Sequence, residues 1–170
     1  AFSLPKALQW ENYSVAWNKA NFSKYFLNSV ILSAGTVAIT IVMTATVSYV
    51  VAKFMHPVIK TIKWFFALFM MVPQILLLVP LYYMCKDLNL VAGGTVLFTL
   101  MLTNALQGVP YYVFLMTPFV CGINDSILEA AEIDGASQFE AFFRIILPLS
   151  LPAVFMVALL SFIGIWNEYI

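Results

Sequence analysis

Four long stretches without a charged residue divide the chain, and each of them is strongly apolar. Each is longer than the roughly 20 residues that an α-helix needs to cross about 30 Å of hydrocarbon. Hydrocarbon gives the backbone no hydrogen-bond partner, so a span of this kind is helical. We predict four membrane spans, at about residues 26–52, 62–85, 92–120 and 145–167. Because Gly93-Gly94 is a poor helix interior, we expect 88–94 to form a loop.

The first 25 residues differ from the rest. Trp10, Tyr13 and Trp17 are spaced to share one face of a helix, among polar neighbours. Aromatic side chains on one face favour the membrane–water interface. We therefore predict an interfacial segment over 1–25 and a transmembrane domain over 26–170. The chain stops directly after the fourth span, so we expect a fragment that lacks at least one helix at each end.

The polar segment between the third and fourth spans, 124–144, has the pattern of two short helices. Six of the sixteen charged residues lie in it. Two serine–glutamate pairs have the spacing of a capping box, Ser126 with Glu129 and Ser137 with Glu140. Gly135 lies between them, where a helix end favours a left-handed residue. An apolar stripe is predicted on the second helix from Phe139, Phe142, Phe143 and Ile146. Small side chains surround the turn, which favours an elbow that docks another protein over an ordinary solvated loop.

Composition and charge agree with a membrane protein. Hydrophobic residues make up 63% of the chain and charged residues 9%, which excludes a soluble globular domain and a disordered chain. Eight basic residues balance eight acidic ones, so no basic surface for nucleic acid is expected. Basic residues divide evenly between the two sets of loops, and the positive-inside rule therefore assigns no orientation.

Candidate catalytic chemistry is sparse. The single histidine, His56, and the two cysteines have no metal-ligand spacing, and no phosphate-binding P-loop motif occurs. Cys85 and Cys121 end successive spans and should lie near opposite membrane faces, so we exclude a disulfide between them. We expect no catalytic, cofactor-binding or metal-binding residue in this chain.

Two polar stripes run along the predicted spans. Ser29, Ser33, Thr36, Thr40, Thr44 and Ser48 form the first, for which we favour helix packing. The second consists of Thr95, Thr99, Thr103, Gln107 and Tyr111, with Asn104 beside it. For Thr99, Thr103, Asn104, Gln107 and Tyr111, a translocation path and ordinary packing are equally consistent with the pattern. Asn104 and Gln107 are costly in lipid and should face protein or water. We expect helix kinks at Pro73, Pro80 and Pro110.

One motif resembles a known family. Glu129-Ala130-Ala131, Gly135, Ile145 and Leu147-Pro148 match, at every position, the EAA loop of ATP-binding-cassette (ABC) importer permeases. Four further segments are similar to helices of the maltose-type carbohydrate permeases, namely 21–30, 71–74, 79–82 and the run Trp166-Asn167-Glu168-Tyr169. The likeness covers essentially the whole chain. Such permeases usually have six helices, so we expect that the first and the sixth are absent here.

The resemblance implies an all-α, polytopic transmembrane helical bundle of the type I importer class. It implies a bacterial inner-membrane permease subunit, not an enzyme, that moves an oligosaccharide or related carbohydrate into the cytoplasm. Implied partners are an ATPase dimer, a second permease, an extracytoplasmic solute-binding protein and membrane lipid, with ATP and magnesium on the ATPase. The EAA loop would be a cytoplasmic coupling-helix elbow, and 1–25 would be extracytoplasmic. Its implied docking residues are Glu129, Ala130, Ala131, Asp134, Gly135, Ala136 and Ser137.

Two alternatives stay open. The transported solute could be something other than a sugar, such as a polyamine. The chain could also be a helical membrane protein without ATP coupling. The Trp166-to-Tyr169 run favours a sugar, and the elbow favours ATP coupling, because only an importer needs a surface complementary to an ATPase.

Overall fold

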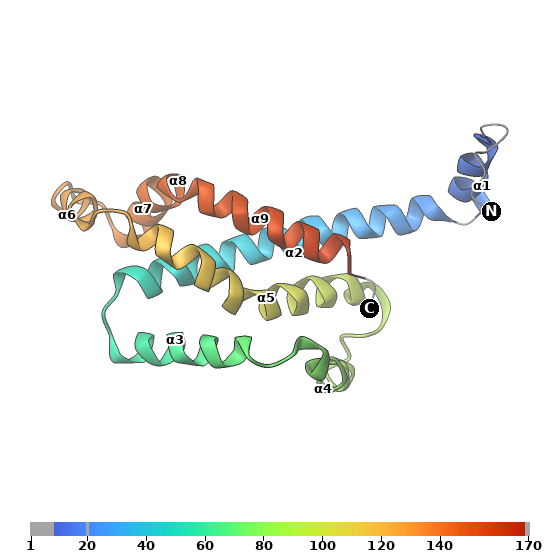
Figure 1. Cartoon of the computed structure of the whole chain (residues 1–170), viewed down its shortest axis with the longest axis horizontal. Helices are drawn as coiled ribbons and strands as arrows, with labels where there is room; N and C mark the ends of the chain where they lie inside the picture. The colour runs from blue at the N-terminus through green and yellow to red at the C-terminus, as the bar shows by residue number, and fades with distance from the viewer. Residues whose placement is uncertain (1–8, 20, 169–170) are drawn as a thin grey trace, which may run out of the picture. The chain divides into compact units, whose positions relative to one another are not determined.

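The computed structural model describes residues 9–19 and 21–168, and its regular elements are helices (Figure 1). The predicted all-α fold is confirmed. The described residues form two compact units that divide between Ile31 and Leu32, inside the long helix α2 (Phe22–Lys53). We describe each unit by itself.

The first unit contains α1 (Glu11–Lys19) and the start of α2. Its aromatic rings pack in pairs: Trp10 and Tyr13 have centroids 5.9 Å apart, and Trp17 lies 5.6 Å from Phe22. These side chains remain largely exposed. The place of this segment at a membrane interface stays a prediction, and residues 1–8 lie outside the described part.

The second unit holds the remaining helices. In chain order these are α3 (Pro57–Met70), α4 (Gln74–Asp87), the 3₁₀ turn η1 (Gly93–Thr95), α5 (Val96–Cys121), α6 (Asp125–Ile133), α7 (Gln138–Ala141), the π-helical turn η2 (Phe142–Ile146), α8 (Leu147–Leu149) and α9 (Leu151–Trp166). Helix α5 packs against α9 and α3, and α6 packs against α7. In Figure 1 the α2–α3 connection and the α6–α7 region lie at the same end of this unit.

The core of the second unit joins α2, α5, η2 and α9. It consists of Ala45, Tyr49, Met116, Val120, Phe142, Ile146, Ala153 and Val157. The serine and threonine stripe of α2 faces inward, since Ser33, Thr36, Thr40, Thr44 and Ser48 are all buried. Small side chains there let neighbouring helices approach closely, as membrane helices commonly do. These five residues face the interior of the unit and Ser29 is exposed, and the packing role expected for the stripe stays a prediction.

Only α2, among the described helices, is long and apolar enough to span a membrane alone, and up to four spans are present if each bent pair of helices counts as one. The second predicted span breaks between α3 and α4 by 104°. Pro73 causes this break, because it caps α4 in an extended conformation and disfavours a helical residue before it. Pro80 and Pro110 lie inside α4 and α5 without ending them.

The fourth predicted span is also not straight. The segment from α7 to α8 meets α9 at 74°, with Ser150 at the bend and Pro152 just inside α9. Proline lacks an N–H and its ring clashes with the carbonyl four residues earlier, so the helix cannot continue unbent. Helix α9 alone is therefore shorter than the span expected over 145–167.

Candidate functional site

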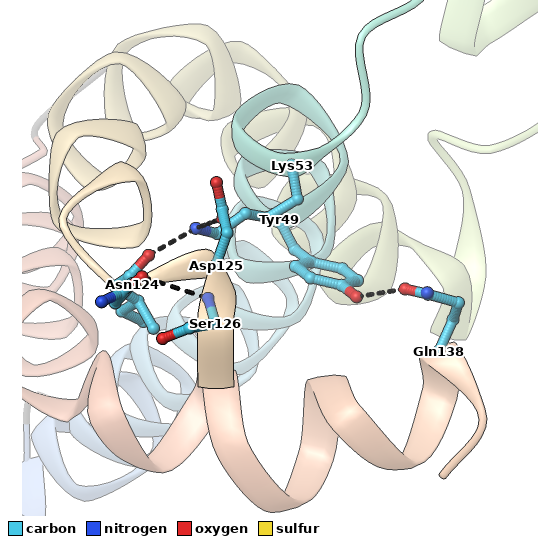
Figure 2. Close-up of polar contacts among 7 residues, drawn as sticks. Tyr49, Lys53, Asn124, Asp125, Ser126 and Gln138 are labelled. Carbon is cyan, nitrogen blue, oxygen red and sulfur yellow. Dashed lines mark hydrogen bonds and ion pairs between the residues drawn. The ribbon is translucent and has the colours of Figure 1, made fainter. Parts of the chain in front are cut away.

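The first arm of the elbow, α6, starts at a different cap from the one that the spacing predicted. Asn124 is the N-cap, and its side-chain oxygen accepts a hydrogen bond from the Ser126 N–H at 3.1 Å (Figure 2). Ser126 is thus already inside the helix. The predicted Ser126–Glu129 capping box is wrong, because Asn124, an equally good cap, comes two residues earlier. Glu129 therefore makes no capping hydrogen bond.

The turn of the elbow is a complete Schellman motif. Gly135 N–H donates to the Glu132 carbonyl at 3.0 Å, and Ala136 N–H donates to the Ala131 carbonyl at 2.9 Å. Gly135 has φ of +85°, as the sequence predicted. A Cβ at this position would meet no other atom within 4 Å. Glycine is needed here for its backbone conformation and not for space.

The second arm, α7, has the capping box that the sequence predicted. The Ser137 hydroxyl accepts from the Glu140 N–H at 3.3 Å, and the Glu140 carboxylate accepts from the Ser137 N–H at 3.0 Å. Arg144 lies 3.7 Å from the same carboxylate. The hydrogen bonds from Ser137, and then the Arg144 charge, hold the pKa of Glu140 below its ordinary value.

The predicted apolar stripe on the second arm splits into two faces. Phe142 and Ile146 are buried in the core, whereas Phe139 and Phe143 are exposed and contact each other at a tilt of 54°, with ring centroids 4.6 Å apart. The split begins at Phe139 of α7, and from Phe142 onward the π-helical turn η2 also changes the rotation between successive residues. The predicted single stripe is therefore wrong.

The implied docking residues separate by exposure. Glu129, Ala130, Asp134, Gly135 and Ser137 are exposed, Ala136 is half-buried and Ala131 is buried. Ala131 thus lies on the inner side of α6 and is kept small by packing within the elbow.

An apolar residue beside this set was missed from the sequence. Ile133 is 86% exposed and follows Glu129 and Ala130 by one helical turn, so the three share one outward face. The sequence did contain a signal for this residue: Ile133 stands just before the predicted helix end and one helical turn after Glu129. The outward face of α6 therefore combines a charge, a small residue and an apolar tip.

A cavity of about 550 Å³ lies in the second unit, between α2, α4, α5 and α9. Its polar lining includes Thr36, Thr40 and Ser161 as well as the amide side chains of Gln74, Asn104 and Gln107. Within the described part of the chain, Glu168 is the one charged residue that lines it. A wall of hydroxyls, amides and aromatic carbon suits a neutral polar solute.

Most of the suspected path residues line this cavity. Thr99, Thr103, Asn104 and Gln107 do so, whereas Tyr111 does not and its neighbour Tyr112 takes that place. The threonine hydroxyls donate to backbone carbonyls, Thr99 to Leu90 at 2.9 Å and Thr103 to Thr99 at 2.9 Å. Whether these residues form a translocation path stays a prediction.

Glu168 was not singled out for the path from the sequence. The Asn104 amide donates to its carboxylate at 2.8 Å. Burial raises the pKa of Glu168, and the hydrogen bond from Asn104 opposes that shift. Tyr169, which completes the run resembling carbohydrate permeases, lies outside the described residues.

Metal and disulfide chemistry find no support within residues 9–19 and 21–168. No group of three metal-ligating side chains comes together there. Both cysteines are free thiols, Cys85 buried and Cys121 exposed.

Together the fold and the elbow define a helical membrane protein with a polar, capped helix pair between two spans. The chain belongs to the family of binding-protein-dependent transport system inner membrane components, whose sequence model matches residues 45–170. The matched region holds the elbow and nearly all of the cavity lining. Membership makes the chain a non-catalytic component of the inner membrane.

Similar proteins agree with this family. The chain is 34% identical, over 99% of its length, to the diacetylchitobiose uptake system permease protein NgcG of Streptomyces coelicolor. It is 34% identical over 99% of its length to the probable ABC transporter permease protein YurM of Bacillus subtilis. It is 28% identical over 97% of its length to the melibiose/raffinose/stachyose import permease protein MelC of the same species. The chain spans 55%, 55% and 59% of these relatives, respectively.

Proposed function

We propose that this chain belongs to the permease subunit of an ABC importer that moves an oligosaccharide or related carbohydrate into the cytoplasm. A separate ATPase subunit would dock on the elbow of α6 and α7 and supply the energy. A second permease subunit and an extracytoplasmic solute-binding protein would complete the transporter. The observation that carries this proposal is the elbow itself, a capped helix pair with the outward face of Glu129, Ala130 and Ile133.

The preference for a carbohydrate rests on two findings. The relatives' names include diacetylchitobiose, melibiose/raffinose/stachyose and arabinooligosaccharides as their solutes. The cavity supplies hydroxyl and amide groups together with Tyr82 and Tyr112, which suit the hydroxyls and apolar faces of sugars. A solute-stimulated ATPase screen of the complete transporter tests this choice. Stimulation by oligosaccharides is expected, and stimulation by non-carbohydrate solutes alone would overturn it.

A cationic solute such as a polyamine is the second candidate. Glu168 favours it, because a carboxylate at the cavity could pair with an ammonium group. The same screen separates the two candidates when it includes the Glu168→Gln variant. Loss of stimulation by polyamines in this variant would favour a cationic solute, whereas unchanged stimulation by sugars is expected for the carbohydrate importer.

Docking on the elbow is tested through Glu129. Its side chain is exposed on α6 and makes no capping bond, so Glu129→Gln removes a charge and leaves the helix start intact. Removing one member of an interfacial charge pair typically costs about 2–5 kcal/mol. We expect the ATPase affinity to fall at least about tenfold. Glu129→Lys should be worse, because two positive charges would then face each other.

The measurement is complex yield and solute uptake, with Glu11→Lys on α1 as a matched control. A compensating acidic substitution on the ATPase should restore part of the uptake lost in Glu129→Lys. Parental uptake and yield in both Glu129 variants would show that the docking role assigned to this residue is wrong.

A cytoplasmic elbow makes a separate prediction. Ser137 is exposed, so Ser137→Cys should react with a membrane-impermeant thiol reagent from the cytoplasmic side only. The background must lack Cys121, which is itself exposed, and also Cys85. Labelling from the outside would contradict the proposed orientation.

A further inference from the structure

Lys53, the last residue of α2, holds the start of the first elbow arm. Its ammonium lies 2.6 Å from the Asp125 carboxylate and 2.6 Å from the Ile123 carbonyl (Figure 2). The Lys53 side chain is 8% exposed and the Asp125 side chain 74%. A lysine that is this buried needs a fixed partner for its charge. The bond therefore ties the end of α2 to the first residue of α6.

Tyr49 holds the start of the second arm in the same way. It lies one turn before Lys53 on the same face of α2, and its hydroxyl donates to the Gln138 side-chain oxygen at 2.6 Å (Figure 2). Gln138 is the first residue of α7, and its amide also donates to Glu132 on α6. The Tyr49 ring packs on Phe142, with centroids 5.3 Å apart. The end of α2 is thus hydrogen-bonded to both arms of the elbow, and the bond between Gln138 and Glu132 joins the two arms to each other.

The helix that holds the elbow, α2, also reaches the cavity. Thr36 and Thr40 of α2 line the cavity, and α2 runs as one continuous helix from there to Lys53. Lys53 follows Thr40 by thirteen positions, which is about 20 Å along the helix axis. A helix of this length, packed in the core, moves as a stiff element. A displacement of the elbow would therefore be carried by α2 to the wall of the cavity.

We propose that Lys53 and Tyr49 are positioning residues that couple movement of the elbow to movement of α2 at the cavity. This inference rests on the proposed function, because it assumes that an ATPase moves the elbow. Neither residue belongs to the EAA motif, nor do Asp125 and Gln138, to which they bind. The role of the pair is to transmit movement, while the outward face of α6 makes the ATPase contact.

The test measures solute transported per ATP hydrolysed by the complete transporter in proteoliposomes. Lys53→Met keeps most of the apolar stem and removes the ammonium. Tyr49→Phe keeps the ring against Phe142 and removes the bond to Gln138. We expect each variant to assemble with the ATPase and to lose solute transported per ATP by at least about fivefold, a typical lower limit for coupling between sites. Lys60→Met is the matched control, because Lys60 is exposed on α3, and it should keep the parental ratio.

Rescue separates positioning from general stability. Lys53→Arg still donates to both oxygens and should recover most of the ratio, whereas Lys53→Gln should not. If Lys53→Met fails to assemble, Tyr49→Phe decides, since it leaves packing intact. A parental ratio in both Tyr49→Phe and every assembled Lys53 variant overturns the inference. Absence of any ATPase in the parental complex would instead overturn the proposed function.

Discussion

The elbow and the helical bundle treat their polar side chains in opposite ways. In the elbow, Asn124, Ser137, Glu140 and Gln138 each make a hydrogen bond, although most of them are exposed to solvent. In the described part of the bundle, five buried hydroxyl groups make no hydrogen bond to another group of the chain, those of Thr36, Thr44, Ser48, Ser150 and Ser161, although Thr99 and Thr103 of α5 bond to backbone carbonyls. The contrast is therefore between the elbow and these five buried hydroxyl groups.

The difference follows from what defines the shape of each region. The short helices α6 and α7 have little core of their own, so hydrogen-bonded caps and side-chain cross-links specify the angle between them. In the bundle, side-chain size specifies the distance between helices, and Ser48 and Thr44 are both fully buried there. A hydroxyl in the bundle is tolerated because it is small. A hydroxyl in the elbow is needed for the bond that it makes.

The bundle should respond most strongly to added volume. Ser48→Leu places a larger side chain in a fully buried site and should cost about 1–3 kcal/mol through overpacking. Thr44→Val, which removes an unpaired hydroxyl at nearly constant shape, should be neutral or slightly stabilising. Thermal unfolding of the purified permease in detergent measures both. Marked destabilisation by Thr44→Val would show that the hydroxyl has a bonding role in the bundle as well.

The turn of the elbow should respond to backbone conformation instead. Gly135 has φ of +85°, where a β-branched residue is strained, so Gly135→Val should cost about 1–2 kcal/mol and weaken ATPase assembly while the subunit still inserts. Gly135→Asn is the control, because asparagine accepts this conformation better. An added Cβ meets nothing within 4 Å, so the cost at that carbon comes from the backbone conformation and not from overpacking. Equal transport by the parent, Asn and Val variants would count against this geometry.

The elbow could be predicted largely from the sequence because its determinants are local. Gly135, and Ser137 with Glu140, act within a few residues of each other, and the structure confirms all three. The wrong prediction of the α6 cap is also local. Asn124 and Ser126 can both cap a helix, and the spacing from Ser126 to Glu129 led to the wrong choice. The grip of Lys53 and Tyr49 on the elbow lay beyond prediction, since it joins residues about seventy and ninety positions apart.

The bundle was less predictable because its determinants are tertiary. The four apolar stretches marked where helices lie, and the kink expected at Pro73 is a break of 104°, but the 74° bend at Ser150 was not predicted. Four of the five suspected path residues line the cavity, but the periodic stripe included Tyr111, and Tyr112 lines the cavity instead. Glu168 also lines the cavity and accepts a hydrogen bond from Asn104, which lies 64 positions away in the sequence. A contact over this separation cannot be predicted from a local sequence pattern.

A smaller effect separates the two possible caps of α6. Asn124→Ala should destabilise the elbow by about 1 kcal/mol, because the Ser126 N–H loses its acceptor. Ser126→Ala should have little effect, since Ser126 is an exposed residue inside the helix. Hydrogen exchange of the 124–128 amides measures the difference. A larger effect of Ser126→Ala than of Asn124→Ala would support the Ser126–Glu129 capping box and contradict Asn124 as the cap.

The smallest expected effect is a pH dependence of the second arm. Bonds from Ser137 lower the pKa of Glu140, so the charged form is favoured in the folded elbow. The stabilisation that follows is present above the ordinary glutamate pKa and is lost as the pH falls through the lowered value. Glu140→Gln keeps a side chain that can close the capping box but cannot titrate. Amide exchange over 137–141, corrected for intrinsic rates, should therefore rise on acidification in the parent and stay flat in Glu140→Gln. Parallel pH profiles would show that the paired carboxylate does not stabilise the elbow, and the contrast with the bundle would then rest on the neutral caps alone.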